Sequence, residues 1–193
     1  MEFQVQRLSE EDKQDKLARV AASIKGYPNF PKEGVLFRDV FATLQDVQAT
    51  RDLLHLFYDR YVDLDVDVFV GIDSRGFIFG SQLALLLGKR FVPVRKAGKL
   101  PGRCRQVEYS LEYGTDRLEI QEGSVGPGDR VVVIDDLIAT GGTMLAACRL
   151  VEEVGATVVE TACVVELPEL GGRQVVDKYP LFVLTQFGDS VEE

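Results

Sequence analysis

Two adjacent carboxylates and a pair of glycines lie close together in the segment VVVIDDLIATGGTM, residues 131–144. Val131 to Ile134 are all β-branched, which is typical of a strand that is buried on both faces. Asp135 and Asp136 come directly after this predicted strand. Because open parallel sheets bind ligands at the carboxyl ends of their strands, these two acids predict a ligand site.

The loop after the two acids has the composition of a phosphate-binding site. Glycines let backbone N–H groups approach an anion without an intervening Cβ, and a helix start adds unpaired N–H donors and a favourable dipole. The predicted phosphate cradle consists of Ala139, Thr140, Gly141, Gly142 and Thr143. The two acids beside it suit sugar hydroxyls or a hydrated magnesium ion. An ordinary strand–turn–helix is the alternative, but packing alone gains nothing from adjacent acids after a buried strand.

Several other kinds of site are poorly supported. The P-loop motif is absent because no lysine follows the glycines, and GxGxxG occurs nowhere. His55 is the only histidine, which argues against Ser-His-Asp catalysis and most histidine-containing metal sites. The three cysteines form no CxxC pair, which argues against a disulfide framework or a zinc cluster. Proton transfer is therefore expected to come from carboxylates, tyrosine or lysine.

A second candidate anion site lies in GIDSRG, residues 71–76, again between a predicted strand and a predicted helix. Asp73, Ser74 and Arg75 come just before Gly76, so a helix start and an arginine are available to grip phosphate together. A capped helix start explains this segment equally well when it is taken alone. Its placement, parallel to that of the phosphate cradle, favours the anion site.

Two later segments have the composition of a closing loop. The first is RKAGKLPGRCRQ, residues 95–106, in which no acid interrupts Arg95, Lys96, Lys99, Arg103 and Arg105. Its glycines and proline predict a mobile loop, and a basic loop in an acidic protein indicates a lid over an anionic substrate. A solvated charged loop is the alternative. The second is EYSLEYG, residues 108–114, whose Glu112 and Tyr113 could close with the lid. Taken alone, Glu112 is simply an acid in a strand or turn.

The elements that must position these segments alternate between strands and helices. Helices are expected from Ser9 to Ile24 and over about 51–61, 77–87 and 144–154. Strands are expected at 66–72, 91–94, 131–134, 157–165 and 181–184, and residues 27–41 are expected to form an ordered loop. The alternation predicts an α/β fold with a mainly parallel sheet. No internal repeat or linker interrupts the chain, so residues 1–193 are expected to form one domain.

The composition is that of an acidic globular protein, with 46% hydrophobic and 27% charged residues and a formal charge of -9. An acidic chain repels polyanions, so general binding to nucleic acid or to a membrane surface is not expected. The N-terminal residues lack the apolar core of a signal peptide, and the apolar runs are too short to span a bilayer. These features predict a cytoplasmic protein.

Together, the four segments resemble the type I phosphoribosyltransferases, and most closely the branch that acts on adenine. VVVIDDLIATGGT is similar to the family's phosphoribosyl pyrophosphate motif, and FPKEGVLFRD, GIDSRGFIFG, RKAGKLPG and SLEYG are similar to segments of the adenine branch. They occur in the family's order over roughly residues 24–187. Residues 40–43, VFAT, lack a proline that usually follows FRD, and the two ends of the chain have no clear counterpart.

The resemblance implies a type I phosphoribosyltransferase fold, in which helices flank a mainly parallel sheet that carries a small N-terminal hood and a flexible catalytic loop. It implies transfer of the phosphoribosyl group of phosphoribosyl pyrophosphate to adenine, which gives AMP and pyrophosphate in purine salvage. Mg²⁺ would be the cofactor, held by the substrate pyrophosphate and through water by Asp135 or Asp136, with no direct protein ligand. A homodimer is also implied.

Roles follow from the same resemblance. The phosphate cradle would bind the 5′-phosphate, and Asp135 and Asp136 would hold the ribose hydroxyls. The pyrophosphate would be surrounded by Asp73, Ser74, Arg75, Arg95, Lys96 and Lys99. Adenine would contact Leu36, Phe37, Arg38 and Leu137, and the catalytic loop would supply Glu112 and Tyr113.

Ala139 separates branches of the family. Relatives that act on 6-oxopurines carry an aspartate at this position, which manages a proton of the base, so Glu112 is the candidate for that work here. Orotate enzymes also lack the aspartate, and an orotate or 6-oxopurine acceptor stays open as an alternative. A non-catalytic sensor of phosphoribosyl pyrophosphate is another, although a regulator that binds nucleic acid should carry a basic face. A scaffolding domain would leave the coincidence of motifs unexplained.

Overall fold

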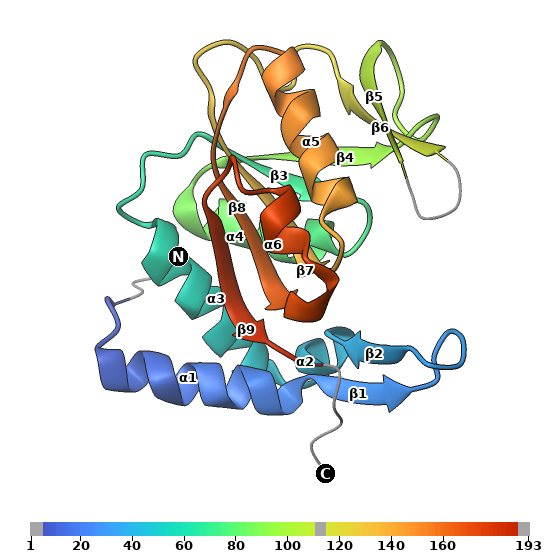
Figure 1. Ribbon diagram of the computed structural model, residues 1–193. Helices are drawn as coiled ribbons and strands as arrows, with labels where there is room; N and C mark the ends of the chain where they lie inside the picture. The colour runs from blue at the N-terminus through green and yellow to red at the C-terminus, as the bar shows by residue number, and fades with distance from the viewer. Residues whose placement is uncertain (1–5, 111–114, 189–193) are drawn as a thin grey trace.

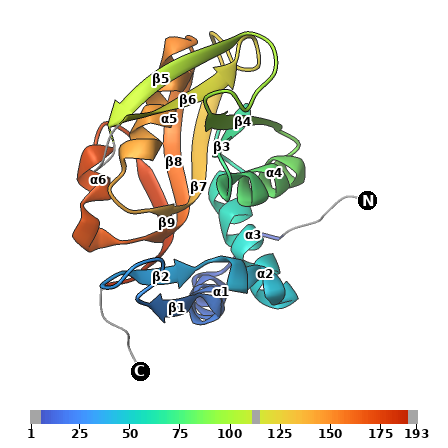
Figure 2. The same ribbon diagram turned by 90° about the vertical axis from the view of Figure 1, so that its right-hand side faces the viewer.

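The computed structural model describes residues 6–110 and 115–188, and it has the α/β architecture that the alternating sequence pattern predicts (Figures 1 and 2). The main sheet of the described chain has seven strands in the order β5-β6-β4-β3-β7-β8-β9. The strands from β4 to β9 in this order are parallel to one another. The β5–β6 hairpin extends the sheet at one edge, where β6 runs antiparallel to β4.

The strands are β1 (Lys25–Pro28), β2 (Leu36–Asp39), β3 (Val68–Ile72), β4 (Arg90–Lys96), β5 (Cys104–Ser110), β6 (Thr115–Gln121), β7 (Arg130–Ile138), β8 (Thr157–Glu166) and β9 (Leu181–Gln186). The α-helices are α1 (Glu10–Ser23), α2 (Phe41–Gln45), α3 (Val47–Tyr61), α4 (Gly76–Leu87), α5 (Gly142–Glu153) and α6 (Gly172–Val175). A short 3₁₀ turn, Pro168–Leu170, precedes α6.

Helices cover both faces of the sheet, so its central strands are buried on both sides. Successive side chains of a strand point to opposite faces. Val131 and Val133 of β7 belong to the hydrophobic core that includes α5. Val132 and Ile134 belong to the core that includes α1, α3 and α4. The uninterrupted apolar sequence of β7 follows from this double burial.

The N-terminal hood, which consists of α1, β1, β2 and α2, lies at one end of the sheet (Figures 1 and 2). Ser9 and Asp12 form a capping box at the start of α1, and the sequence predicts a helix start at this place. Lys16 and Arg19 of α1 lie 2.6 and 2.7 Å from the buried carboxylate of Asp52 in α3. These contacts fix the hood on α3.

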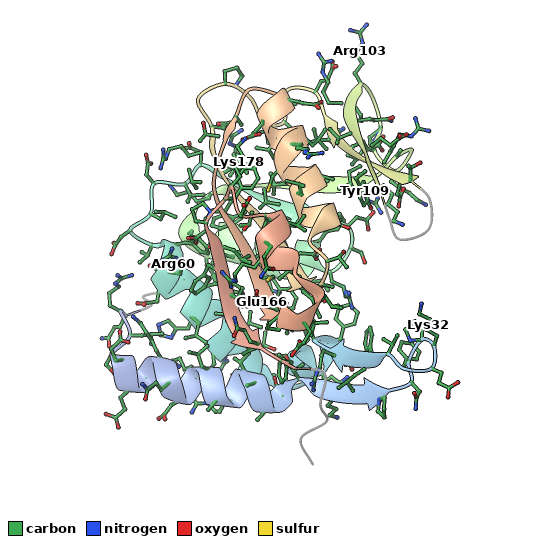
Figure 3. The ribbon with its side chains drawn as sticks, viewed as in Figure 1. Lys32, Arg60, Arg103, Tyr109, Glu166 and Lys178 are labelled. Atoms are coloured by element: carbon green, nitrogen blue, oxygen red, sulfur yellow. The ribbon has the colours of Figure 1, made fainter. Side chains whose placement is uncertain are left out.

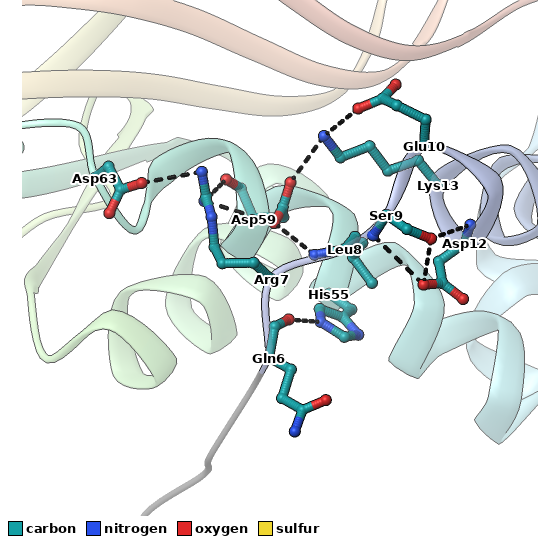
Figure 4. Close-up of polar contacts among 10 residues, drawn as sticks. All are labelled: Gln6, Arg7, Leu8, Ser9, Glu10, Asp12, Lys13, His55, Asp59 and Asp63. Atoms are coloured by element: carbon teal, nitrogen blue, oxygen red, sulfur yellow. Dashed lines mark hydrogen bonds and ion pairs between the residues drawn. The ribbon is translucent and has the colours of Figure 1, made fainter.

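The residues before α1 are also attached to α3 (Figure 4). Arg7 and Lys13 contact the carboxylate of Asp59, and the Arg7 guanidinium also lies 2.9 Å from Asp63. A ring nitrogen of His55 lies 2.8 Å from the carbonyl oxygen of Gln6. His55 therefore helps to attach the residues before α1 to α3.

Three expectations about local structure are wrong. Strand β7 continues through Asp135 and Asp136 to Ile138, because β8 continues beside it and pairs with it as far as Glu166. Residues 27–41 are not all loop, because β2 pairs with β1 in an antiparallel ladder. Residues 95–106 are not all loop, because Arg95 and Lys96 end β4 and β5 begins at Cys104, which leaves a turn between them. Among the described residues, every helix is too short or too polar to span a membrane.

Candidate active site

The predicted phosphate cradle lines a cavity of about 210 Å³ at the end of β7. Its wall consists of the continuous run from Asp135 to Met144 together with Arg75. The cavity thus brings together the acid pair, the cradle and one residue of the GIDSRG segment. Strands β3 and β7 are neighbours in the sheet and parallel, so their carboxyl ends meet at this edge. The two segments that the sequence predicts to bind anions therefore lie at one site.

The glycines of the cradle have a packing role that the sequence did not reveal. Gly141 has a φ of 80°, which only glycine adopts readily, and it is the N-cap of α5. A Cβ on Gly141 would lie 2.6 Å from the carbonyl oxygen of Gly172 at the start of α6. The backbone of α6 therefore supports the cradle from behind. Sequence reasoning missed Gly172, although the Gly171–Gly172 pair is itself a signal of close backbone approach.

The acid pair is largely removed from water. Asp136 is 2% exposed, and its Oδ2 lies 3.0 Å from Nε of Arg75. Within the described chain this oxygen accepts no hydrogen bond, although it forms that ion pair. Asp135 Oδ1 accepts the backbone N–H of Asp136 at 2.8 Å. A buried carboxylate oxygen without a hydrogen-bond donor suits a ligand hydroxyl.

Burial also changes the protonation of the pair. Burial raises the pKa of Asp135 well above its ordinary value, and the negative charge of Asp136 raises it further. Burial likewise raises the pKa of Asp136, and the Arg75 guanidinium opposes this change. Two adjacent buried carboxylates therefore resist carrying two full negative charges, and Arg75 favours the charge on Asp136.

The remaining residues of the predicted pyrophosphate site lie at the ends of β3 and β4. Asp73 and Ser74, joined by a cis peptide, follow β3. Arg95, near the end of β4, donates from Nε to Oδ2 of Asp73 at 2.9 Å. Lys96 is more exposed, and its Nζ lies 2.8 Å from Asp116 in β6. These two cations and Asp73 thus lie at the carboxyl ends of the parallel strands, at the same end of the sheet as the phosphate cradle.

The basic residues of the segment 95–106 differ in their contacts and in the direction of their side chains. The backbone N–H of Lys99 donates to the carboxylate of Glu119 at 2.8 Å, while its side chain lies at an exposed position. Arg103 projects away from the molecule beyond the β5–β6 hairpin (Figure 3). Arg105 lies 3.4 Å from Glu122. The structure therefore associates Arg95 with Asp73 and directs Arg103 outward.

The predicted base-binding residues come from two places. Leu36 and Phe37 are in β2 of the hood, and Leu137 is in β7 beside the cradle. The Arg75 guanidinium lies 5.8 Å from the centre of the Phe37 ring, which connects the hood to the acid pair. The Arg38 side chain instead donates to the carbonyl oxygen of Gly188 at 2.8 Å and lies over the Phe187 ring. Its guanidinium therefore faces the end of β9.

The predicted catalytic residues, Glu112 and Tyr113, lie outside the described residues. The strands that flank them are described, and Ser110 of β5 pairs with Thr115 of β6. Burial raises the pKa of Tyr109, and the nearby Thr143 side chain of the cradle opposes this change. Sequence reasoning did not single out Tyr109, because one tyrosine in a short strand carries no signal of its contact with α5.

Residues 43–192 match the family described as the phosphoribosyl transferase domain. Adenine phosphoribosyltransferase 1 of Triticum aestivum is 55% identical over 176 residues, which cover 91% of this chain and 97% of that protein. The adenine phosphoribosyltransferase of Desulfosudis oleivorans is 51% identical over 166 residues, covering 86% of this chain and 96% of the relative.

Solved structures show the same similarity. The adenine phosphoribosyltransferase of Saccharomyces cerevisiae, complexed with an imino-altritol bisphosphate and adenine, matches with a TM-score of 0.85 and 41% identity, over 89% of this chain and 99% of that one. The Trypanosoma brucei enzyme, in complex with AMP, pyrophosphate and ribose-5-phosphate, matches with a TM-score of 0.80 and 33% identity, over 93% of this chain and 82% of that one.

Proposed function

The chain belongs to the phosphoribosyl transferase family and, within it, to the adenine phosphoribosyltransferases, and from this premise we propose how it acts. It transfers the phosphoribosyl group of phosphoribosyl pyrophosphate to adenine and releases AMP and pyrophosphate, a reaction of purine salvage. The observation that carries the proposal is the single cavity formed by Arg75, the acid pair and the phosphate cradle. This cavity offers separate places for a phosphate and for sugar hydroxyls.

The proposed roles follow the geometry from one end of the substrate to the other. Backbone N–H groups and hydroxyls of the cradle bind the 5′-phosphate at the start of α5. Asp135 and Asp136 accept hydrogen bonds from the ribose hydroxyls. The pyrophosphate is surrounded by residues at the ends of β3 and β4 and in the turn after β4. They are Asp73, Ser74, Arg75, Arg95, Lys96 and Lys99. Leu36, Phe37, Arg38 and Leu137 form the base site, in which Arg38 contributes through its backbone because its side chain faces Gly188.

The site suits a magnesium ion that is bound mainly by the substrate. Among the described residues, no group of three or more His, Cys, Asp or Glu side chains is arranged to hold a metal. Asp135 and Asp136 supply carboxylate oxygens at the edge of the cavity, which suits a hydrated Mg²⁺ that is carried mainly by pyrophosphate oxygens. When bound, the ion neutralises negative charge on the departing pyrophosphate.

The reaction is a displacement at the anomeric carbon with oxocarbenium character. The bond from this carbon to the pyrophosphate oxygen breaks, and a bond to a ring nitrogen of adenine forms. Arg75 and Arg95 stabilise the charge that develops on pyrophosphate, because fixed cations in a partly buried site need no reorganisation. Glu112 accepts the proton from the imidazole ring of the base, and Tyr113 closes over the reacting atoms.

The choice of base depends on hydrogen-bonding groups in β2. Within the described chain this strand pairs with β1 along one edge only, so its other edge has backbone N–H and carbonyl groups to offer. Adenine presents a donor at its amino group and an acceptor at N1, whereas hypoxanthine presents the reverse at both positions. A backbone cannot exchange donor for acceptor, and each mismatched buried group costs ~1–3 kcal/mol.

The test is an assay of pyrophosphate release with purified protein, phosphoribosyl pyrophosphate, magnesium and four bases. We expect strong use of adenine and a kcat/KM lower by ~10²–10⁴ for hypoxanthine, guanine and orotate. A comparable kcat/KM for any of these three would overturn the choice of adenine but not phosphoribosyl transfer. Absence of pyrophosphate release with every base would overturn the proposed function itself.

A homodimer in the cytoplasm, built from residues 1–193 as one domain, completes the proposal. Association through α4 would cover Leu85, an apolar side chain that is 81% exposed. Sedimentation of the protein and of Leu85→Glu tests the dimer, because a charge on a buried interface weakens association. Cell fractionation tests the location, and a relative from Arabidopsis thaliana is described as chloroplastic.

A further inference from the structure

Glu119 is a buried carboxylate in β6, between β4 and β5 and next to the basic segment. It is 2% exposed, and in the β-ladders it pairs with Arg95 of β4 and with Gln106 of β5. Its Oε1 accepts the backbone N–H groups of Lys99 and Leu100, each at 2.8 Å. Its Oε2 accepts Nε2 of Gln106 at 3.0 Å. Burying a carboxylate costs free energy unless hydrogen-bond donors satisfy it, and three donors satisfy Glu119 here.

The carboxylate is held in its charged form by the turn that follows β4. Burial raises the pKa of Glu119, but the backbone N–H groups of Gly98, Leu100 and Lys99 outweigh burial and keep it below its ordinary value. Successive N–H groups that converge in this way form an anion-binding concavity. Since Glu119 occupies that concavity, the backbone of the basic turn is engaged by the protein's own carboxylate.

The same turn is connected to the proposed pyrophosphate site. The carbonyl oxygen of Lys99 accepts a hydrogen bond from Nη1 of Arg95 at 3.3 Å. Nε of the same guanidinium donates to Asp73 at 2.9 Å. The orientation of Arg95 therefore depends on the position of the Lys99 carbonyl, and that position depends on Glu119.

We propose that Glu119 is a positioning residue for pyrophosphate recognition, which acts by fixing the turn that orients Arg95 toward Asp73. This inference rests on the proposed function, in which Asp73 and Arg95 surround the pyrophosphate. A positioning role for Glu119 differs from a general structural role in its effect on different ligands. Ligands that carry a pyrophosphate should be affected by changes at Glu119, whereas AMP, which lacks that group, should not.

The experiment measures binding of phosphoribosyl pyrophosphate with Mg²⁺, and separately of AMP, by calorimetry, together with KM for both substrates. We expect Glu119→Ala to weaken phosphoribosyl pyrophosphate binding about tenfold or more, since hydrogen bonds to charged groups have this size. AMP binding and KM for adenine should stay at their wild-type values. Glu122→Gln is the matched control, because Glu122 follows β6 closely but pairs with Arg105 outside this network.

A conservative series keeps the inference testable if Glu119→Ala does not fold. Glu119→Gln retains an oxygen for the Lys99 and Leu100 N–H groups but turns an amide donor toward the amide of Gln106. Adding Gln106→Glu restores a donor–acceptor pair, so the double variant should recover affinity that Glu119→Gln loses. Equal losses for AMP and phosphoribosyl pyrophosphate, or no loss in the folded variants, would overturn the positioning role. If the wild-type protein releases no pyrophosphate with any base, it is the proposed function that fails.

Discussion

A Cβ on Gly172 would lie 2.3 Å from the carbonyl oxygen of Ala139 in the phosphate cradle. It would also lie 2.8 Å from a side-chain carbon of Ile138. The first of these neighbours is backbone and cannot swing aside like the end of a flexible side chain. The start of α6 therefore approaches the cradle at a distance that only glycine permits. The shape of the cradle depends on a residue thirty positions after Gly142, the second of its own glycines.

Gly172→Ala should displace the cradle and weaken the binding of every ligand that carries a 5′-phosphate. Small-to-large changes in tight packing cost about 1–3 kcal/mol, so we expect a clear loss of thermal stability as well. Binding of AMP and of phosphoribosyl pyrophosphate should fall together, as measured by calorimetry. Gly126→Ala is the control, because a Cβ there meets nothing within 4 Å and its backbone needs no special conformation. Wild-type affinity of Gly172→Ala for AMP would show that the cradle does not depend on this contact.

Asp135→Asn should make the protein more stable near neutral pH. Burial raises the pKa of Asp135 in the folded state, so the folded protein binds this proton more tightly than the unfolded chain does. Wild-type stability therefore decreases as pH rises from the ordinary aspartate range, with a pKa near 3.8, up to the raised folded pKa. Asparagine has no charged form and avoids this loss, while its side-chain oxygen can still accept the Asp136 N–H.

The measurement is thermal unfolding of wild type and Asp135→Asn across the acid and neutral range. The difference in Tm should be small below the ordinary aspartate pKa and should grow as pH rises. Activity of the variant should fall, because the carboxylate proposed to hold a ribose hydroxyl is lost. Asp15→Asn, at an exposed position of α1, should change neither quantity. A Tm difference that does not vary with pH would contradict the role of burial.

Arg75→Lys should impair the enzyme although it keeps the positive charge. The planar guanidinium contacts Asp136 through Nε and lies over the Phe37 ring, and an ammonium group has neither the shape nor the donors to do both. We expect weaker binding of phosphoribosyl pyrophosphate and a higher KM for adenine. Arg90→Lys is the control, because Arg90 pairs with Asp129 at the other end of β4. Unchanged values of both parameters would remove Arg75 from the site.

Much of this site was predictable because its residues are grouped by the ends of parallel strands. The alternating pattern predicts the sheet, and once β3 and β7 are neighbours, the Asp73–Arg75 and Asp135–Thr143 segments must meet. The strand end itself was misplaced, because Asp135 and Asp136 look like loop residues from their polarity. They remain in the ladder because β8 continues beside them and pairs with residues up to Ile138.

The contacts that the sequence did not predict join segments that are far apart in the chain and that no sequence pattern connects. Gly172 supports the cradle, Tyr109 lies near Thr143, and Glu119 holds the turn at Lys99. Each pairing joins residues that are distant in sequence, and each depends on three-dimensional approach. The sequence predicted a mobile loop for the basic segment for the same reason. Its glycines and proline indicate a turn, but only the neighbouring strand β6 reveals the carboxylate that fixes it.

Glu112→Gln should lower the rate of the chemical step without changing affinity for phosphoribosyl pyrophosphate. Glutamine preserves size and polarity but cannot accept the proton that adenine loses as its ring nitrogen bonds to the ribose. General acid–base groups contribute ~10²–10⁴-fold, so a loss of that size is expected in the single-turnover rate of AMP formation. A single turnover is the right measurement because release of products limits many enzymes and would hide the effect.

Glu108→Gln provides the matched control for this variant. Glu108 lies in the same EYSLEYG segment, at an exposed position of β5 opposite Arg117. Its loss should leave the rate unchanged. The pH profile separates a proton acceptor from a residue that only shapes the loop, since the wild-type rate should fall as Glu112 becomes protonated and the variant should lack that limb. A Glu112→Gln enzyme with a near wild-type single-turnover rate would assign the proton transfer to another group.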